Sequence, residues 1–257
     1  MRVIRFAAGD QAVYGLVEDD AVRRVDGSPF EALTPGERVG SFDEAQLLAP
    51  CQPTKIVAIG RNYVAHAREH RAEVPLEPLI FLKPPSAVIA HGQAIVLPPQ
   101  SKQVEHEGEL AVVIGARAKN VSEANAWAHV LGVTCANDVT ARDLQSSDGQ
   151  WSRAKGFDTF CPLGPWLRIG LAPEQIGALS VVCRVNGQVR QSGNTRDMVF
   201  GIPRLIAHIS AVMTLEPGDA ILTGTPAGVG PLHEGDVVEV EIESIGVLRN
   251  TVRTPAS

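Results

Sequence analysis

Short apolar and alternating stretches dominate the first part of the chain. Three segments are rich in β-branched side chains and are separated by Gly and Asp, namely residues 2–7, 12–18 and 21–27. This pattern is typical of short strands joined by turns. The stretch that follows, up to Pro53, mixes turn residues with only a weak helical period. The pattern therefore predicts a small N-terminal β-meander domain at residues 1–52 and a main domain at residues 53–257.

The main domain contains more strand patterns than helix patterns. Apolar or alternating runs predict strands at residues 55–60, 104–115, 219–230, 236–246 and 247–252. Helices are predicted at residues 62–73, 121–132 and 203–213, with Asn62 as the N-cap of the first and Pro203 in the first turn of the last. The regular strand–helix alternation of βαβ units is missing. The sequence predicts a β-rich α+β fold with mostly antiparallel or mixed sheets.

Composition and charge narrow the classes of function. The chain has 257 residues, of which 44% are hydrophobic and 20% charged, and a net charge of −6. Lys and Arg are scattered without a basic stripe, so no nucleic-acid partner is expected. No apolar run reaches about 18 residues, so no membrane partner is expected. The chain begins without the apolar run of a signal peptide and its four cysteines form no CxxC motif, which predicts a cytoplasmic protein with reduced thiols.

Three glutamates occupy alternate positions at the start of the predicted strand 104–115. Because side chains alternate along a strand, Glu105, Glu107 and Glu109 are expected on one face, with neighbours roughly 7 Å apart at a rise of about 3.3 Å per residue. Three like charges repel one another and resist burial. Solvent exposure relieves the repulsion, and so does a bound Mg²⁺, Mn²⁺ or Ca²⁺ held by the carboxylate oxygens. The spacing alone leaves both interpretations open.

Other polar residues at the ends of apolar segments are candidates for a site. Asp138, which follows an apolar strand, either caps the next turn or faces a cleft. Arg142 and Asp143 are expected to form a structural ion pair. Lys155 lies between glycines, where it is either an ordinary solvated lysine or a group that reaches a substrate. The segment "LTGTPAGVG" lacks the lysine of a phosphate-binding loop and is expected to form a tight turn at a pocket edge.

The segment "HAREH" at residues 66–70 fits the H-x-x-E-H pattern of inverted zinc peptidases. A zinc hydrolase of this kind requires His66 and His70 as ligands together with a glutamate from a second helix, and no segment of the chain is convincing as that helix. The alternative is a short helix that presents one histidine and one carboxylate to a substrate, opposite a metal held elsewhere.

Six segments together resemble the fumarylacetoacetate hydrolase family. They occur in the family's order between Ile56 and about Val252 and read "GRNYVAHARE", "PLIFLKP", "HEGELAVVIG", "ANDVTARDLQ", "AKGFDTFCPLGPW" and "LEPGDAILTGTPAGVG". Their combination is specific to the family, although no single segment is. The N-terminal segment resembles the small appendage of the bacterial members, among them acylpyruvases and 2-hydroxyhepta-2,4-diene-1,7-dioate isomerases. The resemblance implies a main domain with a mixed β-roll or barrel fold, and a homodimer.

The resemblance also implies roles for individual residues. A divalent ion, Mg²⁺ or Mn²⁺ with Ca²⁺ as a third candidate, falls on Glu107, Glu109 and Asp138. The catalytic positions fall on the acid/base pair His66 and Glu69 and on Lys155, and the substrate-binding positions fall on Gln145, Thr225 and Arg61. Many relatives carry Met where this chain has His70, so the resemblance gives His70 no role and makes the H-x-x-E-H match coincidental.

The implied substrates are small 2-oxo or 2,4-dioxo acids. The family's site cleaves a C–C bond, by acylpyruvate hydrolysis or oxo-acid decarboxylation, through an enolate that the metal stabilises. The same site supports a second outcome, the isomerisation or tautomerisation of 2-hydroxy-dienoates, in which His66 and Glu69 only move protons. The sequence does not choose between these outcomes, and the zinc hydrolase on His66 and His70 is the third alternative.

Overall fold

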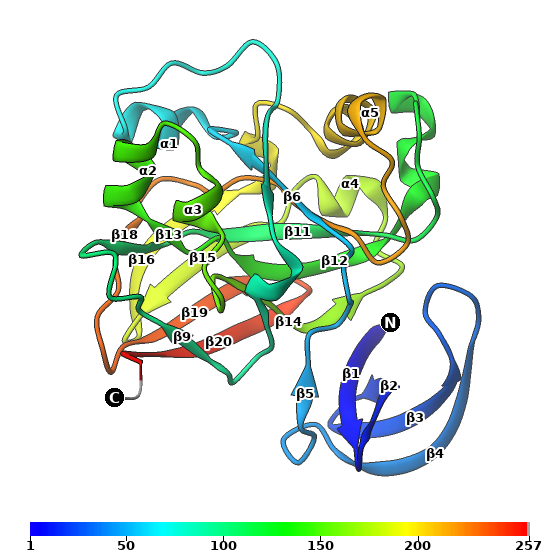
Figure 1. Cartoon of the computed structure of the whole chain (residues 1–257). Coiled ribbons are helices and arrows are strands. Elements are labelled where there is room, and N and C mark those ends of the chain that lie inside the picture. The colour runs from blue at the N-terminus through cyan, green and yellow to red at the C-terminus, as the bar shows by residue number, and fades with distance from the viewer. Residues whose placement is uncertain (256–257) are drawn as a thin grey trace.

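The computed structural model describes residues 1–255, and its largest feature is a twelve-stranded sheet (Figure 1). In spatial order its strands are β4 (Leu33–Ser41), β3 (Ala21–Gly27), β2 (Gln11–Glu18), β1 (Arg2–Ala8), β14 (Cys161–Arg168), β12 (Val130–Asn137), β11 (Gly108–Ile114), β17 (Ala220–Leu222), β6 (Ile56–Gly60) and β7 (Leu79–Lys83), with β5 (Leu47–Leu48) beside β1 and β8 (Val88–Ile89) beside β14. All pairs are antiparallel except β17 with β6 and β14 with β8. The expectation of a mostly antiparallel or mixed sheet is confirmed.

Two smaller sheets complete the strand structure. The first contains β16 (Gln188–Asn194), β15 (Ser180–Val185), β19 (Val237–Ile242), β20 (Gly246–Arg253) and β9 (Ala94–Val96). The second contains β13 (Thr140–Ala141), β10 (Val104–His106) and β18 (Gly230–Pro231). Within residues 1–255 no sheet closes into a barrel, and the β-rich α+β class predicted from the sequence is confirmed.

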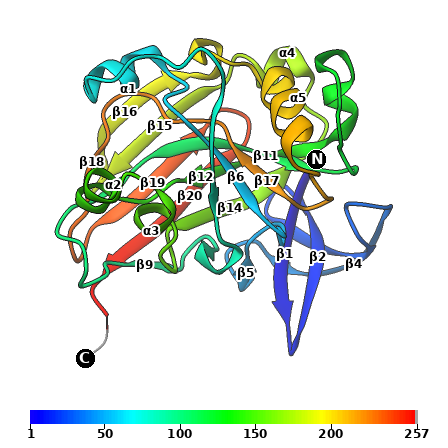
Figure 2. The same cartoon turned by 45° about the horizontal axis from the view of Figure 1, so that its top comes forward.

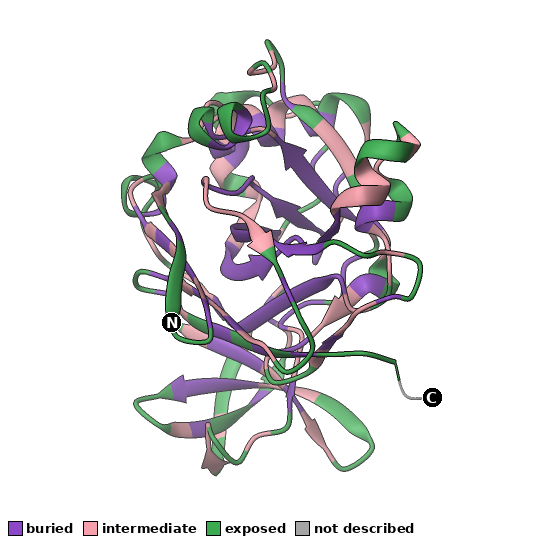
Figure 3. Ribbon diagram, turned by 90° about the vertical axis from the view of Figure 1, so that its left-hand side faces the viewer, coloured by how far each residue is buried: buried purple, intermediate pink, exposed green. Residues whose placement is uncertain are grey.

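Strand β11 lies at the centre of the core because both of its faces are apolar. Leu110, Val112 and Ile114 pack into the cluster that also contains residues of β15, β19 and β20. Ala111 and Val113 point the other way, into a second cluster with residues of β6, β14 and β17. Figure 3 shows buried residues gathered in the strands and exposed residues in the peripheral helices and loops. The apolar run after Glu109 was predicted to enter the core, and it does so.

The helices are short and gather in two places (Figure 2). They are α1 (Val64–Glu69), α2 (Arg142–Asp148), α3 (Ser152–Lys155), α4 (Pro173–Ile176) and α5 (Ile202–Val212), with 3₁₀ turns at Pro85–Ala87, Glu123–His129 and Thr195–Asp197. Helices α1, α2 and α3 lie on one side of the molecule, and α4 and α5 lie on the other. Pro203 occupies the first turn of α5 as predicted. None of the helices in the described range is long and apolar enough to cross a bilayer.

The N-terminal strands β1–β5 have a small core of their own. Its buried members are Ile4, Phe6, Val17, Val22 and Leu47. Strand β1 nevertheless extends the large sheet, because Arg2 and Val3 pair with Arg168 and Leu167 of β14. The predicted β-meander is therefore present, and the boundary at residues 52/53 stays a prediction.

Several sequence-based expectations were wrong in detail. The helix predicted at residues 121–132 is a 3₁₀ segment at Glu123–His129, and strand β12 begins directly after it. The strand predicted at residues 219–230 is formed only at its two ends, as β17 and β18. The predicted strand 104–115 is interrupted at Glu107, whose backbone N–H donates to the Asn137 side chain at the end of β12 (2.9 Å). As a result β10 and β11 belong to different sheets. Asn62 does not cap α1, because the N-cap residue of this helix is Tyr63. The Asn62 side chain instead forms hydrogen bonds with the backbone of Phe200 and Thr223.

Candidate active site and metal centre

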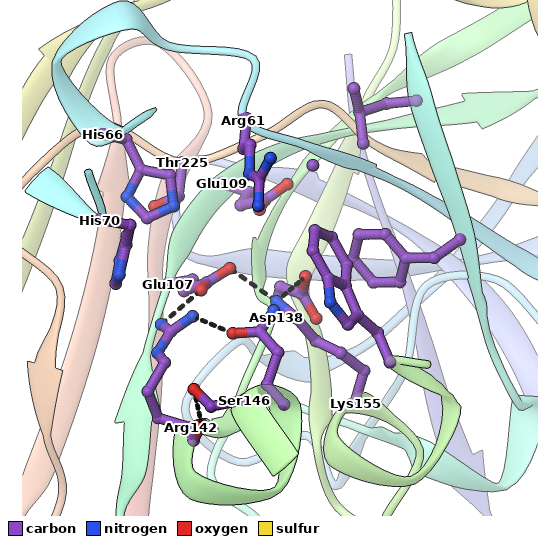
Figure 4. Close-up of a pocket in the computed structure, with 15 residues that line it drawn as sticks. Arg61, His66, His70, Glu107, Glu109, Asp138, Arg142, Ser146, Lys155 and Thr225 are labelled. Carbon is purple, nitrogen blue, oxygen red and sulfur yellow. Dashed lines mark hydrogen bonds and ion pairs between the residues drawn. The ribbon is translucent and has the colours of Figure 1, made fainter. Parts of the chain in front are cut away.

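A cavity of about 220 Å³ opens among β6, β11 and the helices α1, α2 and α3 (Figure 4). Its lining residues come from segments far apart in the chain and are Ile59, Gly60, Arg61, His66, His70, Phe81, Glu107, Glu109, Asp138, Arg142, Gln145, Ser146, Trp151, Lys155 and Thr225. The set contains every candidate site residue predicted from the sequence except Glu69. The fold therefore brings together residues that the sequence could connect only by resemblance.

Three buried carboxylates form what we call the inner site, defined as Glu107, Glu109 and Asp138. Each offers an oxygen atom, and these atoms lie within 4.8 Å of one another. Glu109 lies at the start of β11, Glu107 directly precedes this strand, and Asp138 follows β12, its antiparallel neighbour. Register places Gly108 opposite Asn137, so the start of one strand meets the end of the other. A cluster of oxygen ligands of this kind suits Mg²⁺, Mn²⁺ or Ca²⁺.

Three cations surround the inner site. The Lys155 ammonium donates to Glu107 Oε2 (2.8 Å) and Asp138 Oδ2 (2.6 Å). Lys83, at the end of β7, lies with its Nζ 2.6 Å from Asp138 Oδ1 and also donates to the Lys155 carbonyl (2.6 Å). Both lysine side chains are fully buried. The interpretation of Lys155 as an ordinary solvated lysine is therefore wrong, and Lys83 is a site residue that the sequence analysis missed.

Arg142 is the third cation, and its expected pairing with Asp143 was wrong. Its guanidinium donates to Glu105 (2.8 Å), to Glu107 Oε1 (2.6 Å) and to the Gln145 side chain (2.6 Å). Asp143 instead accepts from Ser101 (2.6 Å). Arg142 therefore bridges Glu105 and Glu107 across the break between β10 and β11. The solvent-exposed interpretation of the three glutamates is excluded, since all three are buried.

Glu109 is the one carboxylate of the inner site without a cationic partner among the described residues. Its Oε2 accepts the Gly224 N–H (2.7 Å). Burial and repulsion from Asp138 and Glu107 raise the pKa of Glu109 well above its usual range. Burial also opposes ionisation of Glu107, but Lys155 and Arg142 more than compensate and lower its pKa. The inner site thus lacks positive charge at Glu109, which fits a divalent cation.

The loop after β17 shapes another wall of the cavity. Gly224 has φ +99°, and a Cβ atom there would lie 2.7 Å from the Cβ of Asn62, so only glycine fits. The next residue, Thr225, donates to the Gly108 carbonyl (2.8 Å) and accepts from the buried Gln191 amide (2.7 Å). The segment reaches the pocket edge through Thr225, but it is an irregular loop with one bend at residue 227 and not the predicted tight turn. The hydroxyl of Thr225 is held in a fixed orientation.

Helix α1 carries a second group, which we call the outer site and define as His66, Glu69 and His70. The ligand atoms of these three residues also lie within 4.8 Å of one another. His66 and His70 pack edge to face with ring centroids 4.7 Å apart. Figure 4 shows both rings on one side of the cavity, across from Lys155. Burial lowers the pKa of His66, and Glu107 opposes this effect only in part, so the imidazole is neutral near pH 7.

An aromatic wall that sequence reasoning did not identify closes the far side of the cavity. Phe81 and Trp151 meet edge to face with centroids 5.1 Å apart. Arg61, with φ +57°, places its guanidinium 6.0 Å from the Trp151 ring centre. An arginine beside an apolar wall can bind an anionic group at the far end of a ligand. The only sequence signal for Phe81 and Trp151 was their position next to the Lys83 and Lys155 segments.

The fold is β-rich, and carboxylates, a lysine and two histidines line one cavity within it. Residues 55–253 match the profile of the fumarylacetoacetate (FAA) hydrolase C-terminal family, and residues 1–50 match the Rv2993c-like N-terminal family. The chain therefore belongs to the fumarylacetoacetate hydrolase family, as the sequence motifs predicted.

Named relatives carry several activities. The human mitochondrial oxaloacetate tautomerase FAHD2A is 48% identical over 81% of this chain and 70% of its own. The crystal structure of 5-carboxymethyl-2-hydroxymuconate delta-isomerase from Mycobacterium smegmatis is 44% identical over 99% and 100% of the two chains, with a TM-score of 0.91. A fumarylacetoacetate hydrolase from Exiguobacterium antarcticum is 34% identical over 99% and 100%, with a TM-score of 0.88. The expectation of an enzyme is confirmed, and the roles of individual residues stay predictions.

Proposed function

We propose that the protein is a divalent-cation-dependent tautomerase or isomerase of small 2-oxo acids, which moves a proton at the carbon beside the 2-oxo group. The observation that carries the proposal is the meeting of the inner site, Lys155 and a neutral His66 in one cavity. Glu107, Glu109 and Asp138 would hold Mg²⁺ or Mn²⁺, with Ca²⁺ as a third candidate. When bound, such an ion supplies Lewis-acid stabilisation of negative charge on the substrate oxygens.

The protein's own groups would divide the remaining work. Burial in the inner site lowers the pKa of Lys155, but Asp138 and Glu107 outweigh this effect and raise it, so Lys155 keeps its positive charge beside the reacting oxygens. His66, neutral and buried, would accept the proton from the substrate carbon and return it elsewhere. Gln145, Thr225 and Arg61 would bind the substrate at the cavity wall.

The geometry of His66 and Glu69 supports proton transfer over hydrolysis. Hydrolysis needs the pair to activate water, but His66 Nδ1 lies 3.5 Å from the Glu69 carboxylate and makes no hydrogen bond to it. Glu69 instead accepts the Gly228 N–H (3.1 Å). Tautomerisation requires only one base that takes and returns a proton. The tautomerase and isomerase names of the human and mycobacterial relatives agree with this choice.

C–C bond cleavage, as acylpyruvate hydrolysis or oxo-acid decarboxylation, is the second candidate. It is favoured by the closeness of Glu69 to His66, since a small closing movement of α1 would bring the two within hydrogen-bond distance. The hydrolase name of the bacterial relative supports it. A zinc hydrolase is not favoured, because Glu69 would have to serve as both metal ligand and base.

The test is a substrate panel with Mg²⁺ and with Mn²⁺. Enolic oxaloacetate, hydroxymuconate-type dienoates and acylpyruvates would each be followed by ultraviolet loss of the enol and, separately, by pyruvate release. Enol loss without pyruvate release supports the tautomerase, and stoichiometric pyruvate supports cleavage. Oxalate should inhibit competitively, because it mimics a planar enolate. No turnover together with no oxalate binding by calorimetry would contradict both candidates.

We also propose that the chain is a cytoplasmic homodimer, as the family resemblance implies. Light scattering after gel filtration should then give twice the chain mass of 27.4 kDa. A monomer at micromolar concentration would contradict the dimer.

A further inference from the structure

The outer site is a second group of side chains that could hold a metal ion, and it shares no residue with the inner site. His66, Glu69 and His70 are the first, fourth and fifth residues of a five-residue segment that ends at the C-cap of α1, and this i, i+3, i+4 spacing places their side chains on one side of the helix. Their ligand atoms lie within 4.8 Å of one another. We propose that this set binds Zn²⁺ and that the bound zinc inhibits the enzyme by occupying His66.

An unsatisfied nitrogen independently indicates a ligand here. His66 is only 7% exposed, and its Nδ1 makes no hydrogen bond within residues 1–255. A buried polar atom without a partner loses its hydration without compensation. Nδ1 lies on the side of Glu69, 3.5 Å from Oε2. A metal ion between the two side chains would give this nitrogen a partner.

The donor types separate the two sites by ion. Imidazole nitrogen suits Zn²⁺, whereas an all-carboxylate set suits Mg²⁺ or Mn²⁺. Histidines four residues apart on a helix are a known zinc-binding pair. The outer site therefore selects a different ion from the inner site, and saturating Mg²⁺ leaves it available.

The exposure of two outer-site residues to solvent and a hydrogen bond to Glu69 also favour zinc binding. Glu69 and His70 are exposed, so an ion reaches them from solvent without passing the inner site. Glu69 is oriented by the Gly228 N–H at 3.1 and 3.2 Å from its two oxygens. An outer-shell donor of this kind holds a ligating carboxylate in place. Small rotations of the exposed Glu69 and His70 are enough to close the set around an ion.

Inhibition rests on the proposed function, in which His66 is the base. A neutral imidazole has one nitrogen lone pair. If Nδ1 binds zinc, the proton stays on Nε2, and no lone pair remains to accept a substrate proton. Two histidines and Glu69 use all the ligands present in this group, so no carboxylate remains to act as the base of a zinc hydrolase.

The test uses full-length protein saturated with Mg²⁺ and titrated with ZnCl₂ by calorimetry. Wild-type protein should bind one zinc per chain at the outer site. His70→Ala and Glu69→Gln should each weaken binding by about 100-fold or more, because even outer-shell changes weaken metal sites about 10–100-fold. His233→Ala is the matched control, because His233 also faces a carboxylate three residues away, Asp236 at 3.7 Å, but belongs to no group of three ligands in the described part of the chain. It should bind zinc as wild type does.

Cobalt absorption provides a readout that needs no turnover. Co²⁺ added to Mg²⁺-saturated protein should give visible bands of a four-coordinate site that are lost in His70→Ala, and zinc should inhibit wild type but not His70→Ala. Equal zinc affinity in wild type and His70→Ala, or inhibition that excess Mg²⁺ relieves, would overturn the site. Zinc binding without inhibition would overturn the inhibitory role. If no substrate is turned over, the binding and cobalt results still decide the site, so its failure and that of the proposed function are distinguishable.

Discussion

The inner and outer sites place similar groups in one cavity but are built in opposite ways. The carboxylates of the inner site come from the segments at the start of β11 and the end of β12. The lysines that contact them come from β7 and α3. The outer site comes from a single helix turn, and two of its three members are exposed. The inner site forms only when strands distant in sequence have paired, whereas the outer site consists of residues within a five-residue segment.

The two sites also differ in how their charge is balanced. Buried ions are costly unless they are paired. In the inner site Lys83, Lys155 and Arg142 neutralise Asp138 and Glu107, while Glu109 is left without a cation in the described chain. In the outer site, solvent stabilises the charge of the exposed side chains. The inner site is therefore expected to be rigid and demanding of its cation, and the outer site adjustable.

The largest expected effect comes from emptying the inner site. EDTA should reduce turnover to background, and Mg²⁺ or Mn²⁺ should restore it. Glu109→Gln should lower turnover by about 10³-fold, since a bound ion contributes several kcal/mol to the transition state. Full activity of metal-free Glu109→Gln protein would contradict the metal assignment.

The same variant has a second expected result in stability. Because the pKa of Glu109 is raised in the folded protein, the folded state binds the Glu109 proton more tightly than the unfolded state does. The contribution of Glu109 to the free energy of unfolding is therefore fully present below pH 4.5 and is lost as the pH rises. Glutamine resembles the protonated form. Metal-free Glu109→Gln should therefore unfold in urea at the same or a higher concentration than wild type at pH 7, but it should gain no stability from Mg²⁺.

Removing the base should have the next largest effect. His66→Ala is expected to lower kcat by about 10²–10⁴-fold, the usual range for general acid–base catalysis. Because His66 is not an inner-site ligand, Mg²⁺ should still raise the unfolding temperature. His70→Ala is the neighbouring control and should keep much of both properties. Loss of Mg²⁺ stabilisation in His66→Ala would show that the two sites are not separate.

Only the local part of the two sites could be predicted from sequence, and the roles of the residues came from the resemblance. The E-x-E spacing, followed by an apolar run, indicated carboxylates at the entrance to the core but left solvent exposure and a metal both open, and Asp138 joined them only through the resemblance. The H-x-x-E-H segment indicated a helix side with His66, Glu69 and His70, but the resemblance gave His70 no role and made the zinc pattern coincidental. These patterns depend on residues within a few positions of one another, which strand and helix periods relate directly.

The cations of the inner site could not be assigned in the same way. Lys83 contacts Asp138 and the Lys155 carbonyl, which are 55 and 72 residues away in sequence. Arg142 bonds Glu105 and Glu107, which lie 37 and 35 residues before it in sequence. From sequence alone, a lysine at the end of an apolar strand is expected to be solvated. Tertiary contacts, not local pattern, decided these positions.

A substitution of Lys83 tests how the charge of the inner site is balanced, with a smaller expected effect. Lys83→Met leaves Asp138 without one of its two ammonium partners, and removing one member of a buried pair costs about 3–5 kcal/mol. Metal affinity should fall about 10–100-fold, as for other groups that orient a ligand. Lys55→Met is the matched control, since Lys55 pairs with buried Asp219 outside the cavity but is itself partly exposed. Urea unfolding and Mg²⁺ titration should show a smaller stability loss and no affinity loss in the control.

The smallest expected effect is a shift in pH dependence, and it connects the two sites. Burial lowers the pKa of His66 and the charge of His70 lowers it further, so kcat/KM should stay high to a pH below about 6.5 before it falls. The fall occurs on the acid side because protonation removes the base. His70→Ala removes one repulsive charge and admits water, and both changes raise the pKa of His66. The acid limb should therefore move to higher pH, by less than about one unit because His70 is exposed to solvent. A shift in the opposite direction would mean that His66 is not the titrating base.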